Sequence, residues 1–168
     1  MRNKKTALSK RIVLALFVLY VLIMLFLLVF PNNYRGQNVF VGSLTWERWS
    51  ARVARDFNLV PLRGILEEIG HIIAGQDVAR NLIYLLGNLV GLVPLGFFLP
   101  MLFSRQRSFK VFLITVVLAL TGLELLQLMT LRGSFDIDDI ILNTAGACLG
   151  FWTLRKPVRS SVDPETDE

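Results

Sequence analysis

The residues best suited to chemistry gather in one stretch of the chain, Glu124 to Gly150. An apolar run there ends in a glutamate and a glutamine, a polar turn carries an arginine and three aspartates, and a second apolar run opens with an asparagine. Carboxylates suit metal binding or acid–base work, and an arginine suits an anion such as phosphate. The stretch therefore predicts a polar binding site made of Glu124, Gln127, Arg132, Asp136, Asp138, Asp139 and Asn143.

The spacing of the aspartates assigns them to helix faces. Asp136, Asp139 and Asn143 stand at i, i+3 and i+7, so they share one face of a helix that begins near Asp136. Asp138 points elsewhere, where it caps a helix end or faces the lipid headgroups. Arg132 lies in the turn, near enough to neutralise one or more of the acids. The alternative to a binding pocket is a capped, salt-bridged hairpin turn.

Glu124 is an ionisable residue near the outer end of an apolar run. An acidic residue costs about 3 kcal/mol at the centre of a membrane helix and less near its end. Such a residue is a functional candidate by default, and the catalytic candidates of this chain are Glu124, Asp136 and Asp139. The alternative is that Glu124 and Gln127, one turn apart on one face, only form hydrogen bonds with neighbouring helices.

A second apolar run repeats the spacing of the amides. Asn81, Tyr84 and Asn88 also stand at i, i+3 and i+7. Because both runs are predicted to cross the membrane in the same direction, Asn88 and Asn143 are expected at similar depth. Each of these two is followed three residues later by a glycine, which permits close approach of helices. Asn81 and Asn88 therefore complete the predicted site.

Composition indicates an integral membrane protein rather than a soluble domain. The 168 residues are 54% apolar, with a mean hydropathy of +0.55. The single cysteine, Cys148, excludes a disulfide framework and a Cys-rich metal site, and the single histidine, His71, excludes a zinc site with two histidines. No aromatic–basic nucleic-acid module or glycine-rich phosphate loop is visible, so no nucleic-acid partner and no cofactor are expected.

The apolar runs predict an all-α, polytopic membrane protein with one domain over residues 1–168. Four runs are long enough to cross a hydrocarbon core, since a helix rises about 1.5 Å per residue. The predicted spans are about 12–30, 82–103, 109–129 and 137–154. Residues 31–80 form an outward loop, in which an amphipathic helix beginning near Ile65 lies on the membrane surface. Residues of about 160–168 are expected to form a disordered acidic tail.

The distribution of basic residues predicts the orientation. Four spans place both termini on one side, together with the short loop between the second and third spans. That side holds eleven lysines and arginines in short segments, against seven on the other side, which also carries most of the acids. The positive-inside rule therefore places both termini in the cytoplasm and the aspartate-rich turn outside.

Three segments of the chain resemble the VanZ-like family of bacterial membrane proteins. The segment Asn58–Ile65 is similar to the family's Asn-Leu-x-Pro-Phe stretch, although Leu62 stands where phenylalanine is usual. The segment Asn81–Pro100 resembles its Asn, Gly-Asn and Pro-Leu-Gly-Phe helix, and Glu124–Gly150 resembles its Glu-x-x-Gln, Arg, Asp-x-Asp-Asp and Asn-Thr-x-Gly signature. The resemblance covers about residues 58–152. The residues that carry it are the nine site candidates named above.

The resemblance implies a cell-membrane protein that lowers susceptibility to teicoplanin and related lipoglycopeptides without remodelling the target precursor. An outward polar pocket at headgroup level would then bind the antibiotic or a lipid-linked peptidoglycan precursor, with membrane lipids as the other partners.

Two alternatives come from other functional classes. One is an integral-membrane enzyme acting on a phospholipid or polyprenyl-linked substrate, with Glu124 or Asp136 as general base and Arg132 as phosphate clamp. The other is a scaffold whose polar residues are structural. A transporter fits less well, because the polar groups gather at one face instead of the midplane.

Overall fold

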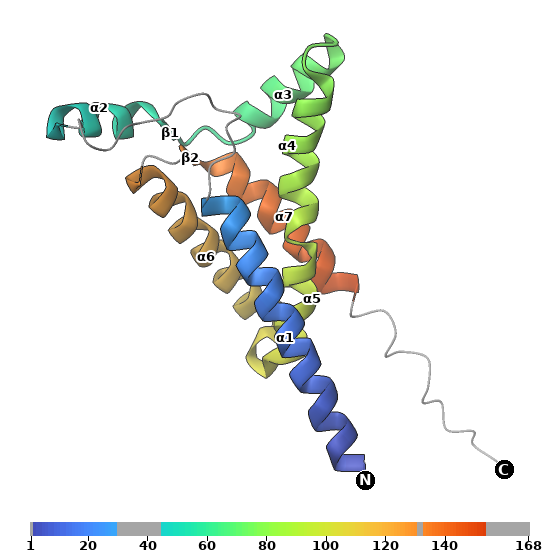
Figure 1. Ribbon diagram of the computed structural model, residues 1–168. Coiled ribbons are helices and arrows are strands. Elements are labelled where there is room, and N and C mark those ends of the chain that lie inside the picture. Colours follow the sequence, from blue (N-terminus) through green and yellow to red (C-terminus); the bar gives the residue numbers. More distant parts are fainter. Residues whose placement is uncertain (1, 30–44, 131–132, 154–168) are drawn as a thin grey trace.

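Most described residues of the chain belong to helices, as the computed structural model in Figure 1 shows. The structure describes residues 2–29, 45–130 and 133–153. The elements in chain order are α1 (Arg2–Val29), α2 (Trp46–Arg55), β1 (Phe57–Asn58), α3 (Arg63–Ile73), α4 (Val78–Gly91), α5 (Val93–Leu102), the 3₁₀-helix η3 (Ser104–Arg107), α6 (Phe109–Met129), β2 (Phe135–Asp136) and α7 (Ile137–Thr153). The mostly helical fold is confirmed, with the short β1–β2 ladder as an addition to the prediction.

Two helical segments of the described chain are long and apolar enough to cross a membrane. They are Val78–Leu102, which joins α4 and α5, and Phe109–Met129, which is α6. The described apolar part of α1, Arg11–Leu27, and the 17 residues of α7 are shorter. Two of the four predicted spans are therefore supported by length and composition, and the other two stay predictions.

The predicted span 82–103 is interrupted near its middle. Pro94 lacks an N–H, which favours a break in the helix just before it. Here the Leu95 N–H donates to the Leu92 carbonyl at 3.1 Å, which is the tighter spacing of a 3₁₀ turn, and the Gly96 N–H donates to the same carbonyl at 3.3 Å with α-helical spacing. At the break, the carbonyl of Gly91 accepts a hydrogen bond of 2.8 Å from the Tyr20 hydroxyl of α1. The Tyr20 side chain thus links α1 to the α4–α5 junction.

We expect the substitution Tyr20→Phe to lower the melting temperature in detergent by roughly 2–4 °C, because about 1 kcal/mol of hydrogen bonding is lost. The matched control is Thr121→Val, since the Thr121 hydroxyl bonds only to the Val117 carbonyl of its own helix. Equal melting temperatures for the two variants would show that the Tyr20 contact adds nothing to stability.

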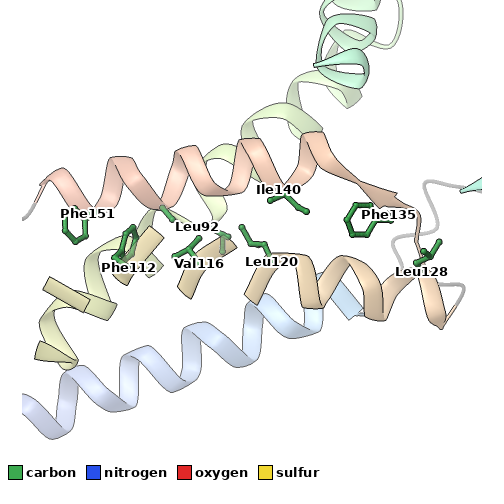
Figure 2. Packing of buried hydrophobic residues seen from close by; sticks show 9 residues of the cluster. Leu92, Phe112, Val116, Leu120, Leu128, Phe135, Ile140 and Phe151 are labelled. Carbon is green, nitrogen blue, oxygen red and sulfur yellow. The ribbon is translucent and has the colours of Figure 1, made fainter. Parts of the chain in front are cut away.

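The apolar core lies between α6 and α7, with Leu92 reaching it from the α4–α5 junction (Figure 2). On α6 the buried positions recur every fourth residue, which places them in one stripe along the helix. The buried apolar residues are Leu92, Phe112, Val116, Leu120, Leu128, Phe135, Ile140, Ala147 and Phe151. At the end near the α7 C-terminus, the rings of Phe112 and Phe151 lie 4.7 Å apart. Packing in this core fixes the position of α6 and α7 along each other. It therefore also positions the residues at their other ends.

Glycines allow α7 to approach α4 and α5 closely. A Cβ atom on Gly146 would lie 1.7 Å from the Leu89 carbonyl oxygen, and one on Gly150 would lie 1.9 Å from that of Val93. Gly96 of α5 meets the Ala147 carbonyl in the same way, at 1.9 Å. The Gly146-x-x-x-Gly150 pair therefore packs helices within one chain.

The elements divide between the two ends of the helix bundle (Figure 1). The start of α1 and η3 lie at one end, while α2, β1, β2 and α3 lie at the other. The predicted amphipathic helix near Ile65 corresponds to α3, which has no buried residue and leaves Leu66 and Ile73 64% and 82% exposed. Helix α2 was not predicted as a helix; in it, the rings of Trp46 and Trp49 stack at 5.0 Å.

Candidate functional site

A two-residue parallel ladder brings distant segments together where α6 ends and α7 begins. Phe57 pairs with Phe135 and Asn58 pairs with Asp136. The two phenylalanine rings stack with their centroids 4.6 Å apart, and Phe135 is buried. This apolar contact positions the Asn58 side chain against the first aspartate of the signature stretch.

Asp136 caps the start of α7. Its Oδ1 accepts a hydrogen bond of 3.0 Å from the backbone N–H of Asp138, two residues further on, which is the geometry of an N-cap. The same oxygen accepts a hydrogen bond of 3.1 Å from Nδ2 of Asn58. The backbone N–H of Asp136 donates to Oε2 of Glu124 at 3.2 Å. Asp136 therefore joins three elements, α6, β1 and α7.

Glu124 belongs to the same buried stripe of α6 as the apolar core residues, four residues beyond Leu120 and four before Leu128. Only 6% of the residue is exposed. Its contact with the Asp136 N–H replaces part of the hydration that burial removes. Glu124 thus holds the first turn of α7 at the end of α6.

Asp138 caps a different helix from its own. The residue is fully buried, and its Oδ1 accepts a hydrogen bond from the Leu62 N–H. Its Oδ2 accepts hydrogen bonds from the N–H groups of Gly64, at 2.7 Å, and Ile65, at 3.2 Å. A carboxylate suits this place, because the first N–H groups of a helix have no partner within the helix. Of the two roles expected for Asp138, it takes that of capping a helix end, although the helix is α3 and not its own, and it is buried instead of facing the headgroups.

The segment that Asp138 holds has an unusual backbone. Leu62 has φ +66° and ψ −2°, a left-handed conformation that costs a non-glycine residue roughly 1–3 kcal/mol. This conformation turns successive N–H groups toward one point, where the Asp138 carboxylate lies. The hydrogen bonds to Asp138 offset the strain.

Asp139 joins α7 to α4. Its Oδ1 accepts hydrogen bonds from the Tyr84 hydroxyl and from Nδ2 of Asn88, the latter at 2.8 Å. The aspartates at positions 136, 138 and 139 therefore contact three different segments: β1, the start of α3, and α4.

The remaining predicted residues lie in more ordinary surroundings. Nδ2 of Asn143 donates to the Asp139 carbonyl of its own helix at 2.8 Å. Asn81 is buried and donates to the Gln76 carbonyl at 3.1 Å, so its hydrogen bond goes to the loop before α4 instead of an aspartate. The Gln127 carbonyl accepts a hydrogen bond of 3.2 Å from the Gly133 N–H. Arg132 lies outside the described residues.

The described residues contain no group of three or more His, Cys, Asp and Glu side chains arranged to hold a metal ion. The three aspartates and Glu124 lie close along the chain or in space, but their oxygen atoms accept hydrogen bonds from different directions. The arrangement can hold the ends of helices together and can accept a hydrogen bond from a polar group that reaches it.

Two side chains that form hydrogen bonds with these aspartates were not among the predicted site residues. Asn58 was visible only as the first residue of the NLVPLRGI segment, and Tyr84 only as the middle member of an i, i+3, i+7 series. The structure adds both, through their hydrogen bonds to Asp136 and Asp139. The series spacing was a usable signal for Tyr84, because its two asparagine neighbours were already candidates.

The chain was compared with known protein families, curated proteins and solved structures. A family model described as VanZ/LLP1 matches residues 17–158, which include all the contacts above. No curated protein and no solved structure matches the chain.

Proposed function

Because the chain belongs to the VanZ/LLP1 family, we propose that it is a bacterial cell-membrane protein that lowers susceptibility to teicoplanin-type lipoglycopeptides. The observation that carries this proposal is the position of the aspartate cluster, which consists of Asp136, Asp138 and Asp139. It lies where α6 ends, at the same end of the bundle as the exposed helices α2 and α3 (Figure 1). In a membrane, that end corresponds to headgroup depth, where lipid-tailed antibiotics and lipid-linked wall precursors also lie.

The proposed topology has four spans with both termini in the cytoplasm. Helix α1 supports this as a further span, because Tyr20 and Phe17 pack it against the Val78–Leu102 segment. Helix α7 supports it because its glycines pack directly on the same segment. The start of α1 and η3, two segments whose sequences are basic, lie at the end of the bundle opposite α3 and β2 (Figure 1), which supports the proposed orientation under the positive-inside rule.

The proposed ligand is an amphiphile whose polar head enters the cluster of aspartates, Glu124 and Asn88. Carboxylates accept hydrogen bonds from hydroxyl and amide groups, which are abundant on glycopeptides and on wall precursors. The exposed apolar side chains of α3 would remain in the lipid beside the ligand's tail.

The substitutions Glu124→Gln and Asp139→Asn are expected to abolish protection against teicoplanin in a susceptible host while membrane levels of the protein stay normal. Both keep side-chain size and remove a negative charge. The measurements are the inhibitory concentration and the amount of protein in isolated membranes. Glu67→Gln is the control, because Glu67 is exposed on α3 and pairs only with Arg63, at 2.9 Å. Full protection by both site variants would contradict the proposed site.

An enzyme is the second candidate, favoured by the burial of an ionisable residue, Glu124, within an apolar helix of membrane-spanning length. In this case one carboxylate acts as general base on a phospholipid or polyprenyl-linked substrate. Mass spectrometry of lipids and wall precursors, with and without the protein, separates the two candidates. A new product indicates the enzyme, whereas unchanged profiles beside intact protection indicate binding. If single substitutions lower abundance before protection, the polar residues are structural.

A further inference from the structure

The segment Asn58–Ile65 covers the aspartates from one side. Its first residue, Asn58, donates to Oδ1 of Asp136, and Oδ1 of Asn58 itself accepts a hydrogen bond of 3.2 Å from the Val60 N–H. The far end of the segment is fastened to Asp138 by three backbone N–H groups. One end of the segment is thus bound to Asp136 and the other to Asp138, so the segment forms one wall beside these two aspartates.

The two oxygens of Asp136 have different surroundings. Oδ1 accepts hydrogen bonds from Asn58 and from the Asp138 N–H. Oδ2 accepts no hydrogen bond from any residue that the structure describes, and it lies 3.9 Å from the position that a Cβ atom on Gly64 would occupy. At Asp138, by contrast, both oxygens are used. Oδ2 of Asp136 is therefore a carboxylate oxygen of the cluster with capacity for a further donor.

We propose that Oδ2 of Asp136 accepts a hydrogen bond from the head of an amphiphilic ligand, and that the missing side chain of Gly64 keeps the space beside this atom open. The proposal rests on the function proposed above and adds Asn58 and Gly64 to the site. Asn58 is a positioning residue: by binding Oδ1, it fixes the rotation of the carboxylate and directs Oδ2 to the ligand.

The same segment indicates the class of the ligand. Leu59, Val60 and Leu62 follow Asn58 and are 58%, 55% and 50% exposed. The wall thus presents apolar side chains next to a carboxylate oxygen that accepts but does not donate. The matching ligand carries an apolar chain beside a hydroxyl, amide or ammonium donor.

The test begins with a measurement that does not depend on antibiotic protection. Membrane vesicles that contain the full-length protein are treated with dicyclohexylcarbodiimide, an apolar reagent that adds to carboxyl groups, and peptides are analysed by mass spectrometry. Asp136 is expected to be modified and Asp138 is not. Gly64→Ala is expected to slow modification of Asp136, because the added methyl group would lie in contact with Oδ2 of Asp136, at 3.9 Å. The same methyl group would lie 3.1 Å from Oδ2 of Asp138. Gly70→Ala on the same helix is the matched control, since its added Cβ meets nothing within 4 Å.

Protection assays then test the ligand contact. Asp136→Asn keeps an oxygen for Asn58 and replaces the other oxygen with a donor, so ligand affinity should fall roughly tenfold or more. Asn58→Ala should raise the rate of Asp136 modification, because Oδ1 loses a donor, while protection falls at normal membrane level. A merely structural role for Asn58 would loosen the whole cluster, so modification of Asp138 would rise together with that of Asp136.

The outcomes separate the proposal from the function on which it rests. If the wild-type protein gives no protection, the proposed function fails, and the modification pattern alone decides whether Oδ2 is open. If the wild-type protein protects and Asp136→Asn protects equally, the ligand contact is overturned. Equal modification of Asp136 and Asp138, or equal effects of Gly64→Ala and Gly70→Ala, overturns the assignment of Oδ2.

Discussion

Replacing Asp138 with alanine is expected to release the start of α3 from α7 and to destabilise the protein by about 3 kcal/mol or more. The carboxylate accepts three backbone hydrogen bonds and is fully buried. A hydrogen bond to a charged group contributes about 1.5–3 kcal/mol, and a buried donor left without a partner costs about 1–3 kcal/mol. The strained backbone of Leu62 would also lose the contact that offsets its conformation.

The measurements for Asp138 are thermal melting in detergent and hydrogen exchange at residues 62–65. Exchange there should increase strongly in Asp138→Ala and to a smaller extent in Asp138→Asn, since an asparagine keeps one acceptor oxygen. The control is Glu67→Ala, because an exposed i, i+4 pair contributes only about 0.3–0.5 kcal/mol. Unchanged exchange at the N–H groups of Leu62, Gly64 and Ile65 in Asp138→Ala would contradict the capping role.

The aspartates show what the spacing along one helix can and cannot predict. The spacing predicted a common face for Asp136 and Asp139, with Asp138 pointing elsewhere. In the structure Asp136 lies in β2, before α7 begins, and the carboxylates of Asp136 and Asp138 both contact the segment Asn58–Ile65, whereas Asp139 contacts α4. The partner of Asp138 was not predictable, since it is a set of backbone N–H groups more than 70 residues earlier in the chain. Backbone groups have no residue-specific signal in a sequence. Only the predicted start of an amphipathic helix near Ile65 indicated that unpaired N–H groups were present in this part of the chain.

The helices show the same division between local and distant effects. The predicted span 109–129 coincides with α6, because an uninterrupted apolar run is a local property. The span 82–103 was correctly placed, but the break before Pro94 was read as tolerated within a single helix. At the break, the Gly91 carbonyl accepts a hydrogen bond from the Tyr20 hydroxyl of α1, a contact between residues 71 positions apart. The mostly helical fold and its two helices of membrane-spanning length were therefore accessible from hydropathy, and the interruptions that position the site were not.

The contacts of the signature stretch explain why a structural role and a binding role are hard to separate there. Asp136, Asp138 and Asp139 each join α7 to another segment. A substitution that removes an acceptor therefore changes both the local charge and the position of a neighbouring element. The isosteric variants and the Gly64 and Gly70 pair separate the two effects, because they change one atom or one methyl group at a time.

Substituting alanine for Gly146 is expected to cause a large loss of stability. The added Cβ would lie 1.7 Å from the carbonyl oxygen and 2.8 Å from the carbonyl carbon of Leu89. Both atoms belong to the backbone of α4, so no side chain can move aside and the helices must separate. Overpacking in a well-packed interior costs about 1–3 kcal/mol and occasionally more, and a backbone clash belongs to the upper part of this range. Gly150→Ala should behave similarly, because its Cβ would lie 1.9 Å from the Val93 carbonyl oxygen.

The expected change in melting temperature has opposite signs for glycines inside and outside this helix contact. Gly122 and Gly87 lie in helices α6 and α4, and a Cβ atom on either meets nothing within 4 Å. Alanine there should leave the melting temperature in detergent unchanged or raise it, because alanine is the better helix former by about 0.5–1 kcal/mol. At Gly146 the same chemical change should lower both the melting temperature and the amount of protein in membranes. Equal behaviour of Gly146→Ala and Gly122→Ala would mean that α7 does not pack on α4 at this glycine. The Asn88–Asp139 contact, only two turns of α7 nearer its start, would then lose its structural support.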